Sequence, residues 1–205
     1  MSGLPAGVVL VVFAFFLGAI PWGYVAGRVT QGIDLRAIGS GGTGATNVLR
    51  SLGGKASAVV FTLDFLKGLL PVFIARFLGF GDVWIALAAV APVVGHCWSP
   101  FIAFKGGKGV ATGAGAAIAL FPQTLLALPV MAVVVWSTRY VSLASLISAV
   151  LVSALAAGFA AAGRLDWPAA LAITAISVII IVRHNANILR LRDGTERRIG
   201  ERVGV

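Results

Sequence analysis

The sequence predicts an all-α polytopic membrane protein with seven transmembrane helices, and three observations support this prediction. Of its 205 residues, 59% are hydrophobic and only 11% are charged, whereas about 25% of the residues of a soluble domain are charged. Long apolar runs recur along the whole chain. The basic residues gather in alternate loops, as they do in the cytoplasmic loops of membrane proteins. We therefore expect residues 1–205 to form a single integral membrane domain.

Five apolar runs are candidates for full spans, because about 20 apolar residues cross a bilayer. They cover residues 4–26, 56–78, 83–98, 140–162 and 167–182. The first run is longer than a signal-peptide core of about 7–15 residues, and further apolar runs follow it. We expect this run to remain in the protein as a span.

The stretch 110–136 is too long for one untilted span, and Phe121-Pro122-Gln123 interrupts it. Counted as one span, it gives six helices and places both chain ends on the same side. Counted as two short helices, about 110–121 and 124–136, it gives seven, with the N-terminus outside and the C-terminus cytoplasmic. Short helices at membrane depth are tolerated where they are buried in protein or line a cavity.

Basic residues decide in favour of seven spans, because Lys and Arg concentrate in cytoplasmic loops. With seven spans, only Arg76 and Arg164 lie outside, and Lys67 lies within a span. With six, the C-terminal arginine cluster moves outside and the asymmetry disappears. The residues placed inside by seven spans are Arg28, Arg36, Arg50, Lys55, Lys105, Lys108, Arg139, Arg183, Arg190, Arg192, Arg197, Arg198 and Arg202.

The net charge of +9 does not indicate a nucleic-acid partner. The aromatic residues lie in apolar runs instead of alternating with Lys and Arg, as they do in many nucleic-acid-binding surfaces. A lone cysteine, Cys97, excludes an internal disulfide framework and a cysteine-rich metal site.

Three polar segments share the predicted cytoplasmic side. The first is GSGGTGATN, residues 39–47, followed by Arg50. Its glycines let backbone N–H groups turn inward ahead of a helix, which favours an anion. It is not a Walker A loop, because Ala45 stands where a lysine is required. The alternative is a flexible turn with a helix cap.

The second segment runs from Gly95-His96 through FIAFKGGKGVAT, residues 101–112. Lys105 and Lys108 lie among glycines at a predicted helix start, so positive charge lies beside free N–H groups. Lysines that snorkel from a cytoplasmic loop are the alternative. That alternative explains the lysines but not the glycines.

The third segment, RHNANILR, ends the last span at residues 183–190. His184 and Asn187 are three residues apart, so they share a helix face. A histidine at a helix end is also often structural, stabilised by the helix dipole. Both interpretations stay open at this point.

Asp64 and Lys67 are charged residues inside the second span, three apart on one helix face. A charge in the membrane is costly and is usually paired. We predict a structural ion pair here in preference to a catalytic one.

Together these motifs closely resemble the bacterial acyl-phosphate-dependent glycerol-3-phosphate acyltransferases, the PlsY family. The similarity covers nearly the whole chain, including Asp34-Leu35-Arg36, the three segments above and Gly194-Thr195-Glu196. One departure is Gly42, which stands where the family usually has asparagine; an amide contact is then missing or replaced by Thr43.

The resemblance implies transfer of a fatty acyl group from acyl phosphate to the 1-hydroxyl of glycerol 3-phosphate, giving lysophosphatidate and inorganic phosphate. It implies seven helices in the bacterial inner membrane with the motifs cytoplasmic, and no metal or organic cofactor. We also expect a monomer, with membrane lipid and the two substrates as its partners.

Both substrates carry a phosphate, so the site needs two anion pockets and an apolar groove. We expect the catalytic residues to be His184, Asn187, Lys108 and Ser40. The predicted acyl-phosphate contacts are Ser40, Gly44, Ala45, Thr46, Ser142, Ser145, His184 and Asn187. The predicted glycerol 3-phosphate contacts are Arg50, Lys105, Lys108, Asn47 and His96.

The sequence leaves open which group attacks the acyl carbon. Cys97 beside His96 is one candidate for covalent catalysis. Direct attack by the glycerol hydroxyl is simpler, since acyl phosphate is already activated and the protein mainly has to position the substrates. The proton then passes to His184 or to the departing phosphate, while Asn187 either holds the carbonyl or fixes the His184 tautomer.

Two functions from other classes compete with this prediction. Short helices and the Asp64–Lys67 pair also occur in transporters of organic phosphates or other anions, but the polar motifs gather at one face and no internal repeat is visible. A Mg²⁺-dependent lipid phosphotransferase needs clustered carboxylates, and the predicted cytoplasmic ones are scattered along the chain.

Overall fold

The structure is a computed structural model that describes residues 3–39 and 41–201. Its described residues form helices and loops, with no strand among them. The elements are α1 Leu4–Ala19, α2 Trp22–Gln31, η1 Leu35–Ala37, α3 Ala45–Leu52, α4 Gly54–Phe77, α5 Asp82–Cys97, η2 Pro100–Ile102, α6 Val110–Leu120, η3 Pro122–Leu126, α7 Ala127–Thr138, α8 Val141–Ala161, α9 Trp167–Arg183 and α10 Asn185–Arg192.

Four helical stretches are long and apolar enough to cross a membrane: Leu4–Gln31, Gly54–Phe77, Asp82–Ile102 and Val141–Ala161. The pair α9 and α10 forms a fifth span if its 56° bend is accepted. Val110–Leu120 and Pro122–Thr138 are shorter apolar helices. The predicted all-helical membrane fold is confirmed, and Pro122 separates two short helices as expected. The number of spans and the orientation stay predictions.

The first span, expected over residues 4–26, is broken between α1 and α2 at Ile20-Pro21. Proline lacks an N–H and cannot continue the hydrogen-bond ladder. At the break, the Ile20 carbonyl oxygen accepts a hydrogen bond of 2.8 Å from Lys67 Nζ on α4, in addition to one of 3.2 Å from Trp22 N. The interruption therefore provides a partner for a buried charge.

Glycines allow the helix backbones to come into direct contact. A side chain at Gly68 on α4 would overlap the Thr112 carbonyl of α6, and one at Gly115 on α6 would overlap the Phe65 carbonyl of α4. Between α1 and α5, Gly95 meets the Phe15 carbonyl in the same way. Helices in lipid lack the hydrophobic driving force that brings helices together in water. Their association therefore depends on van der Waals packing, which such close contact increases.

The short helix α6 ends inside the helix bundle, where Ala119 and Leu120 are buried and its last carbonyl groups need partners. Arg76 on α4 supplies them: Nη1 donates to Ala119 O at 2.6 Å and Nη2 to Leu120 O at 3.0 Å. A half-length helix is stable there because a neighbouring helix completes its hydrogen bonds.

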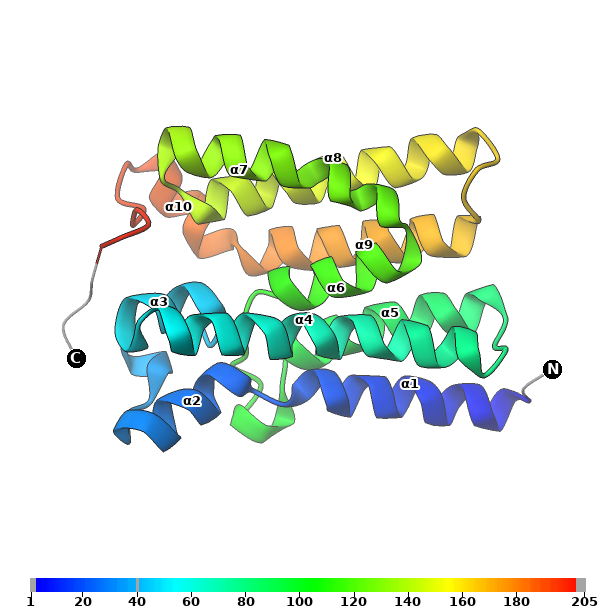
Figure 1. The fold of residues 1–205 in the computed structure, drawn as a ribbon, viewed down its shortest axis with the longest axis horizontal. Helices are drawn as coiled ribbons and strands as arrows, with labels where there is room; N and C mark the ends of the chain where they lie inside the picture. Colours follow the sequence, from blue (N-terminus) through cyan, green and yellow to red (C-terminus); the bar gives the residue numbers. More distant parts are fainter. Residues whose placement is uncertain (1–2, 40, 202–205) are drawn as a thin grey trace.

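Figure 1 shows the long helices lying side by side along the molecule, with α2, α3 and α10 at one end. The start of α1 and the connection between α8 and α9 lie at the opposite end. Segments far apart in the sequence are thus gathered at the end that carries the three polar motifs.

Candidate active site

The glycine-rich loop is folded around the Asn47 side chain. Asn47 Nδ2 lies 3.0 Å from Leu35 O, 3.1 Å from Ile38 O and 2.9 Å from Gly42 O. This holds the loop against the start of α3, whose N-cap is Gly44. Ser40, which we predict to contact acyl phosphate, lies outside the described residues. Gly42, which stands where the family usually has asparagine, lines the cavity described below, whereas Thr43 is buried and does not line it.

The lysine-containing loop is held from two sides. Gly107 N donates to His96 O at 3.1 Å, and Arg183 at the end of α9 donates to Gly106 O and Gly107 O at 3.1 Å each. A side chain at Gly107 would overlap the His96 ring, which explains a glycine there. Burial lowers the pKa of Lys108 to about 8. A desolvated ammonium of this kind is readily stabilised by an anion.

His184 lies at the bend between α9 and α10 and is only 2% exposed. Its Nδ1 is 2.8 Å from Ile180 O. Because a carbonyl oxygen can only accept, Nδ1 carries the hydrogen, and the neutral ring has its lone pair on Nε2. The Ile180 carbonyl therefore fixes the tautomer. Asn187 does not fix it, because its Nδ2 donates to Glu196 and the partner of the His184 ring is the Ile180 carbonyl.

Glu196 is a member of the site that the sequence analysis did not include. It accepts hydrogen bonds from Ser142 Oγ at 2.7 Å, Asn187 Nδ2 at 2.6 Å and Arg190 Nε at 2.8 Å. Burial alone would raise the pKa of this carboxyl, but these donors hold the pKa below its ordinary value. The signals for it in the sequence were the Gly194-Thr195-Glu196 motif and its position between basic residues, after the last helix.

The three polar segments meet around one cavity of about 210 Å³, which confirms that they share a face. Of the predicted site residues, Lys105 is exposed and does not line it. Cys97 is buried and does not line it either, which leaves the thiol without access to a substrate there. The predicted residues that do line it are Gly44, Ala45, Thr46, Asn47, Arg50, His96, Lys108, Ser142, Ser145, His184 and Asn187.

Positive charge and helix N-termini converge on this cavity. The first turn of α3 lines it, as do Gly109, Val110 and Ala111 at the start of α6. Arg50 and Lys108 add two cations, and Arg50 Nε is buried without a hydrogen-bond partner among the described residues. Two helix N-termini and two cations form a site for more than one anionic group.

A second cavity, of about 100 Å³, adjoins the first. Val110, Met131 and Ser145 line both. The rest of its wall comes mainly from apolar side chains of α6, α7, α8 and α9, such as Ala117, Val152 and Ile173. A polar chamber that opens into an apolar groove suits a substrate with a charged head and an apolar tail.

Asp64 and Lys67 form the predicted ion pair, with 2.7 Å between Oδ1 and Nζ. His96 Nδ1 lies 3.6 Å from the same Asp64 oxygen. The cluster is buried, and Asp64 and His96 form part of the cavity wall. The pair thus anchors α4 and also supports the histidine that packs against the lysine loop.

Fold and cavity together define a class: an integral membrane protein with an anion-binding chamber joined to an apolar groove. The sequence model of the family described as glycerol-3-phosphate acyltransferase matches residues 8–194. Glycerol-3-phosphate acyltransferase of Geobacter sulfurreducens is 44% identical over 192 residues, covering 93% of this chain and 96% of that protein. Glycerol-3-phosphate acyltransferase 1 of Deinococcus radiodurans is 42% identical, covering 94% of this chain and 95% of that protein.

Two crystal structures of PlsY, an integral membrane glycerol 3-phosphate acyltransferase, are similar to this fold. The glycerol 3-phosphate form has a TM-score of 0.87 at 40% identity, and the lysophosphatidic acid form 0.83 at 39%. Each comparison covers 95% of this chain and 96% of the other. The chain belongs to the glycerol-3-phosphate acyltransferase family, and it is an acyltransferase of phospholipid synthesis built from membrane helices.

Proposed function

We propose that this protein transfers a fatty acyl group from acyl phosphate to the 1-hydroxyl of glycerol 3-phosphate, at the cytoplasmic face of the bacterial inner membrane. The observation that carries the proposal is the polar cavity lined by two helix N-termini, Arg50 and Lys108, together with the apolar groove that adjoins it. Two phosphates and one acyl chain have complementary places in it. The PlsY structures in glycerol 3-phosphate and lysophosphatidic acid forms support the same substrate and product.

The acyl-phosphate group is assigned to the first turn of α3, where Gly44, Ala45 and Thr46 line the cavity. Backbone N–H groups at a helix start bind phosphate oxygens and stabilise charge that develops on the reacting carbonyl. The acyl chain then enters the groove past Ser145. Ser142 lies at the same wall, where it donates to Glu196.

Glycerol 3-phosphate is assigned to Arg50 and Lys108, with Asn47 and His96 beside them. A charged donor on a phosphate forms the stronger kind of hydrogen bond. Lys105 receives no contact in this assignment, because its side chain is exposed.

The reaction needs one bond to form and one to break. The glycerol oxygen attacks the acyl carbon, the bond from that carbon to the phosphate oxygen breaks, and the hydroxyl proton moves to His184 Nε2. Ile180 keeps this nitrogen unprotonated in the neutral ring. The departing phosphate, whose second pKa is near neutral (about 6 for a phosphoester), is the other acceptor for that proton. The buried Asn187 Oδ1 has no hydrogen-bond partner among the described residues and is available to a substrate hydroxyl.

The arrangement in the membrane is part of the proposal: seven spans, an outside N-terminus, a cytoplasmic C-terminus and a functional monomer. The charge distribution supports this orientation, because the cavity end carries Arg50, Lys108 and the α10 arginines.

The test is acyl transfer by the purified protein in detergent. Labelled glycerol 3-phosphate and palmitoyl phosphate are mixed without added metal, and lysophosphatidate and free phosphate are measured. We expect equal amounts of both products, and palmitoyl thioester in a parallel reaction tests the choice of donor. No product here, with uptake of glycerol 3-phosphate into vesicles, would identify a transporter instead.

Two variants test the assignment of residues. Lys108→Ala is expected to lower kcat/KM by about 10²-fold or more, the effect of losing one preorganised charge donor. Cys97→Ser is expected to stay active, because the thiol is buried away from the cavity. Near-normal turnover of Lys108→Ala would contradict the assignment of Lys108 to glycerol 3-phosphate. Loss of acyl transfer in Cys97→Ser would instead favour covalent catalysis by the Cys97 thiol.

A further inference from the structure

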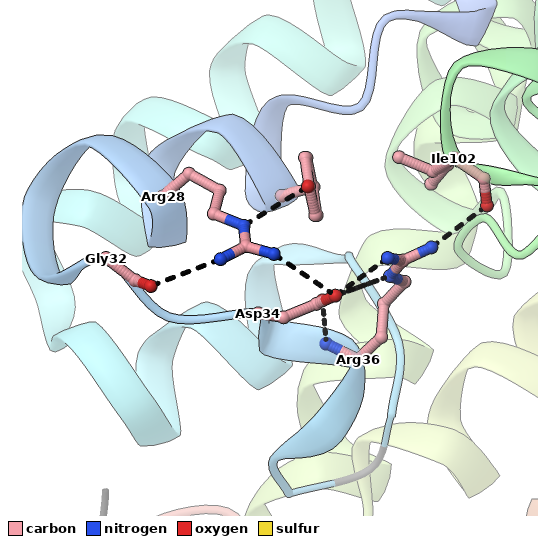
Figure 2. A network of polar contacts seen from close by, with 6 residues as sticks. Arg28, Gly32, Asp34, Arg36 and Ile102 are labelled. Atoms are coloured by element: carbon pink, nitrogen blue, oxygen red, sulfur yellow. Dashed lines mark hydrogen bonds and ion pairs between the residues drawn. The ribbon is translucent and has the colours of Figure 1, made fainter.

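Arg36 makes contacts that the proposed chemistry does not use. It does not line the cavity, and its side chain is 26% exposed. Figure 2 shows it between Asp34 and Ile102, two residues from loops that are far apart in the sequence. Its position is therefore suited to linking two loops and not to binding a substrate.

Asp34 fixes the direction of the Arg36 guanidinium. Nη2 lies 2.7 Å from Asp34 Oδ2 and Nε 3.0 Å from Asp34 Oδ1, a two-point pairing. The Arg36 backbone N–H also donates to Asp34 Oδ1 at 3.0 Å. The Tyr24 ring lies 5.0 Å below the guanidinium carbon. Because these contacts use Nε and Nη2, Nη1 is left to bond a residue outside this segment.

Arg36 Nη1 donates to Ile102 O at 3.0 Å, across 66 positions of sequence. The same carbonyl accepts from Lys105 N at 3.1 Å. Ala103 and Phe104, which follow, have φ angles of 53° and 60°, a left-handed conformation that costs energy in residues with side chains. A tight turn of this kind depends on outside contacts to hold its shape, and it leads directly to Lys108.

On the other side, Arg36 belongs to the loop that Asn47 organises. Leu35 O and Ile38 O, which flank it, both accept from Asn47 Nδ2. Arg36 is thus the side chain that joins the wall of the cavity formed by α3 to the loop that carries Lys108.

We infer that Arg36, oriented by Asp34, is a positioning residue that sets the separation between the glycine-rich loop 39–47 and the lysine loop 105–108. This rests on the proposed function, in which the two loops hold the two phosphates. Because Arg183 and His96 O also hold the lysine loop, losing Arg36 shifts Lys108 without releasing it. The cost therefore appears in the binding of glycerol 3-phosphate and not in folding.

Arg28 provides a matched control. It also lies over Tyr24, at 5.4 Å, and faces Asp34 at 3.9 Å, but its hydrogen bonds go to Tyr24 and Gly32, within its own segment (Figure 2). Removing either arginine takes the same charge and the same stacking from this cluster. Arg36→Ala additionally removes the two-point pairing with Asp34, and of the two substitutions it alone removes the contact with the lysine loop.

The experiment compares Arg36→Ala, Arg36→Lys and Arg28→Ala with the wild type in the acyl-transfer assay and in thermal unfolding. We expect Arg36→Ala to raise the KM for glycerol 3-phosphate about tenfold, with kcat at saturation and the KM for the acyl donor changed less than threefold. Arg36→Lys is expected to fail to rescue, because one ammonium cannot pair with Asp34 in two places and also reach Ile102. Arg28→Ala is expected to stay within twofold.

A double-mutant cycle adds a second readout. Asp34→Asn is expected to raise the same KM by less than Arg36→Ala, and the double variant no more than Arg36→Ala alone, since both act through one contact. Equal kinetics for Arg36→Ala and Arg28→Ala would overturn the inference, as would full rescue by lysine. If Arg36→Ala does not fold, unchanged KM in folded Asp34→Asn overturns it instead. Absence of acyl transfer by the wild type would overturn the proposed function, a different outcome.

Discussion

The polar cavity and the apolar groove share Val110, Met131 and Ser145, yet their chemistry is opposite. The cavity presents charged groups, an imidazole, an amide and helix N-termini. The groove offers aliphatic side chains with a few hydroxyl groups, such as Thr124 and Ser148. Two adjoining cavities thus differ in polarity, and in the proposed function the first holds the reacting groups and the second the acyl chain.

This difference teaches that catalysis and donor choice are separable. Charge and hydrogen bonding lower the barrier at the reacting carbonyl, whichever chain is attached to it. The dispersion contacts and the apolar area that the acyl chain buries in the groove depend on the length of that chain and not on the reaction. Substitutions in the cavity should therefore lower turnover equally for all acyl donors. Substitutions in the groove should instead lower it by an amount that depends on the length of the acyl chain.

The largest expected effect is that of His184→Ala. Loss of a general base lowers kcat by about 10²–10⁴, and the loss should be the same for donors of every chain length. The measurement is kcat with octanoyl, dodecanoyl and palmitoyl phosphate, with circular dichroism to confirm the fold. A loss confined to one chain length would break the distinction between cavity and groove.

The second effect is a pH dependence from Lys108, whose pKa burial lowers to about 8. The ammonium that binds phosphate exists below this pKa, so kcat/KM for glycerol 3-phosphate should fall as pH rises through about 8. Beyond that the loss is about tenfold per pH unit. Lys108→Arg keeps its positive charge throughout this range. Its plot of kcat/KM against pH should therefore lack this fall, even if its activity is lower at every pH. The same fall in the arginine variant would assign the titration to another group.

A smaller and selective effect is expected from Ala117→Leu in the groove. Ala117 is 5% exposed on α6, and a leucine there narrows the space left for the chain. We expect kcat/KM for palmitoyl phosphate to fall about tenfold, while octanoyl phosphate changes less than twofold. The short donor serves as the internal control for folding. An equal fall with both donors would contradict a chain site in this groove.

The smallest effect concerns the stability of the groove. Thr124 Oγ1 is buried without a hydrogen-bond partner among the described residues. Replacing it by the similarly shaped valine should stabilise the protein by about 1 kcal/mol, because an unpaired buried hydroxyl is costly. Ser153→Ala is the matched control, since Ser153 is hydrogen-bonded to Thr174 at 3.0 Å and should lose stability. Thermal unfolding in detergent measures both, and a destabilised Thr124→Val would show that its hydroxyl is paired in the membrane.

Much of this could be predicted from local sequence. Apolar run length predicted the helices, Pro122 predicted the break between the short ones, and i,i+3 spacing predicted the Asp64–Lys67 pair. These features depend on residues close together in the chain, where backbone geometry fixes the distances. The three motifs could also be placed at one end, since that follows from counting spans.

Other features were beyond the sequence because they depend on contacts between distant residues. The break at Ile20 has its partner on α4, and Glu196 reaches Ser142 across 54 positions. The exposure of Lys105 beside the half-buried Lys108 depends on which side of one loop faces the cavity. Spacing alone makes two such lysines equivalent.

The sequence by itself determined a membrane protein with an anion-binding end, because hydropathy, charge and glycine content act along the chain and need no partner. Only the tertiary structure decided that the anion site opens into a groove, that Ile180 sets the His184 tautomer, and that Arg36 joins two loops. These are matters of distance and direction between side chains and backbone groups. They are settled when the helices pack, not when they form.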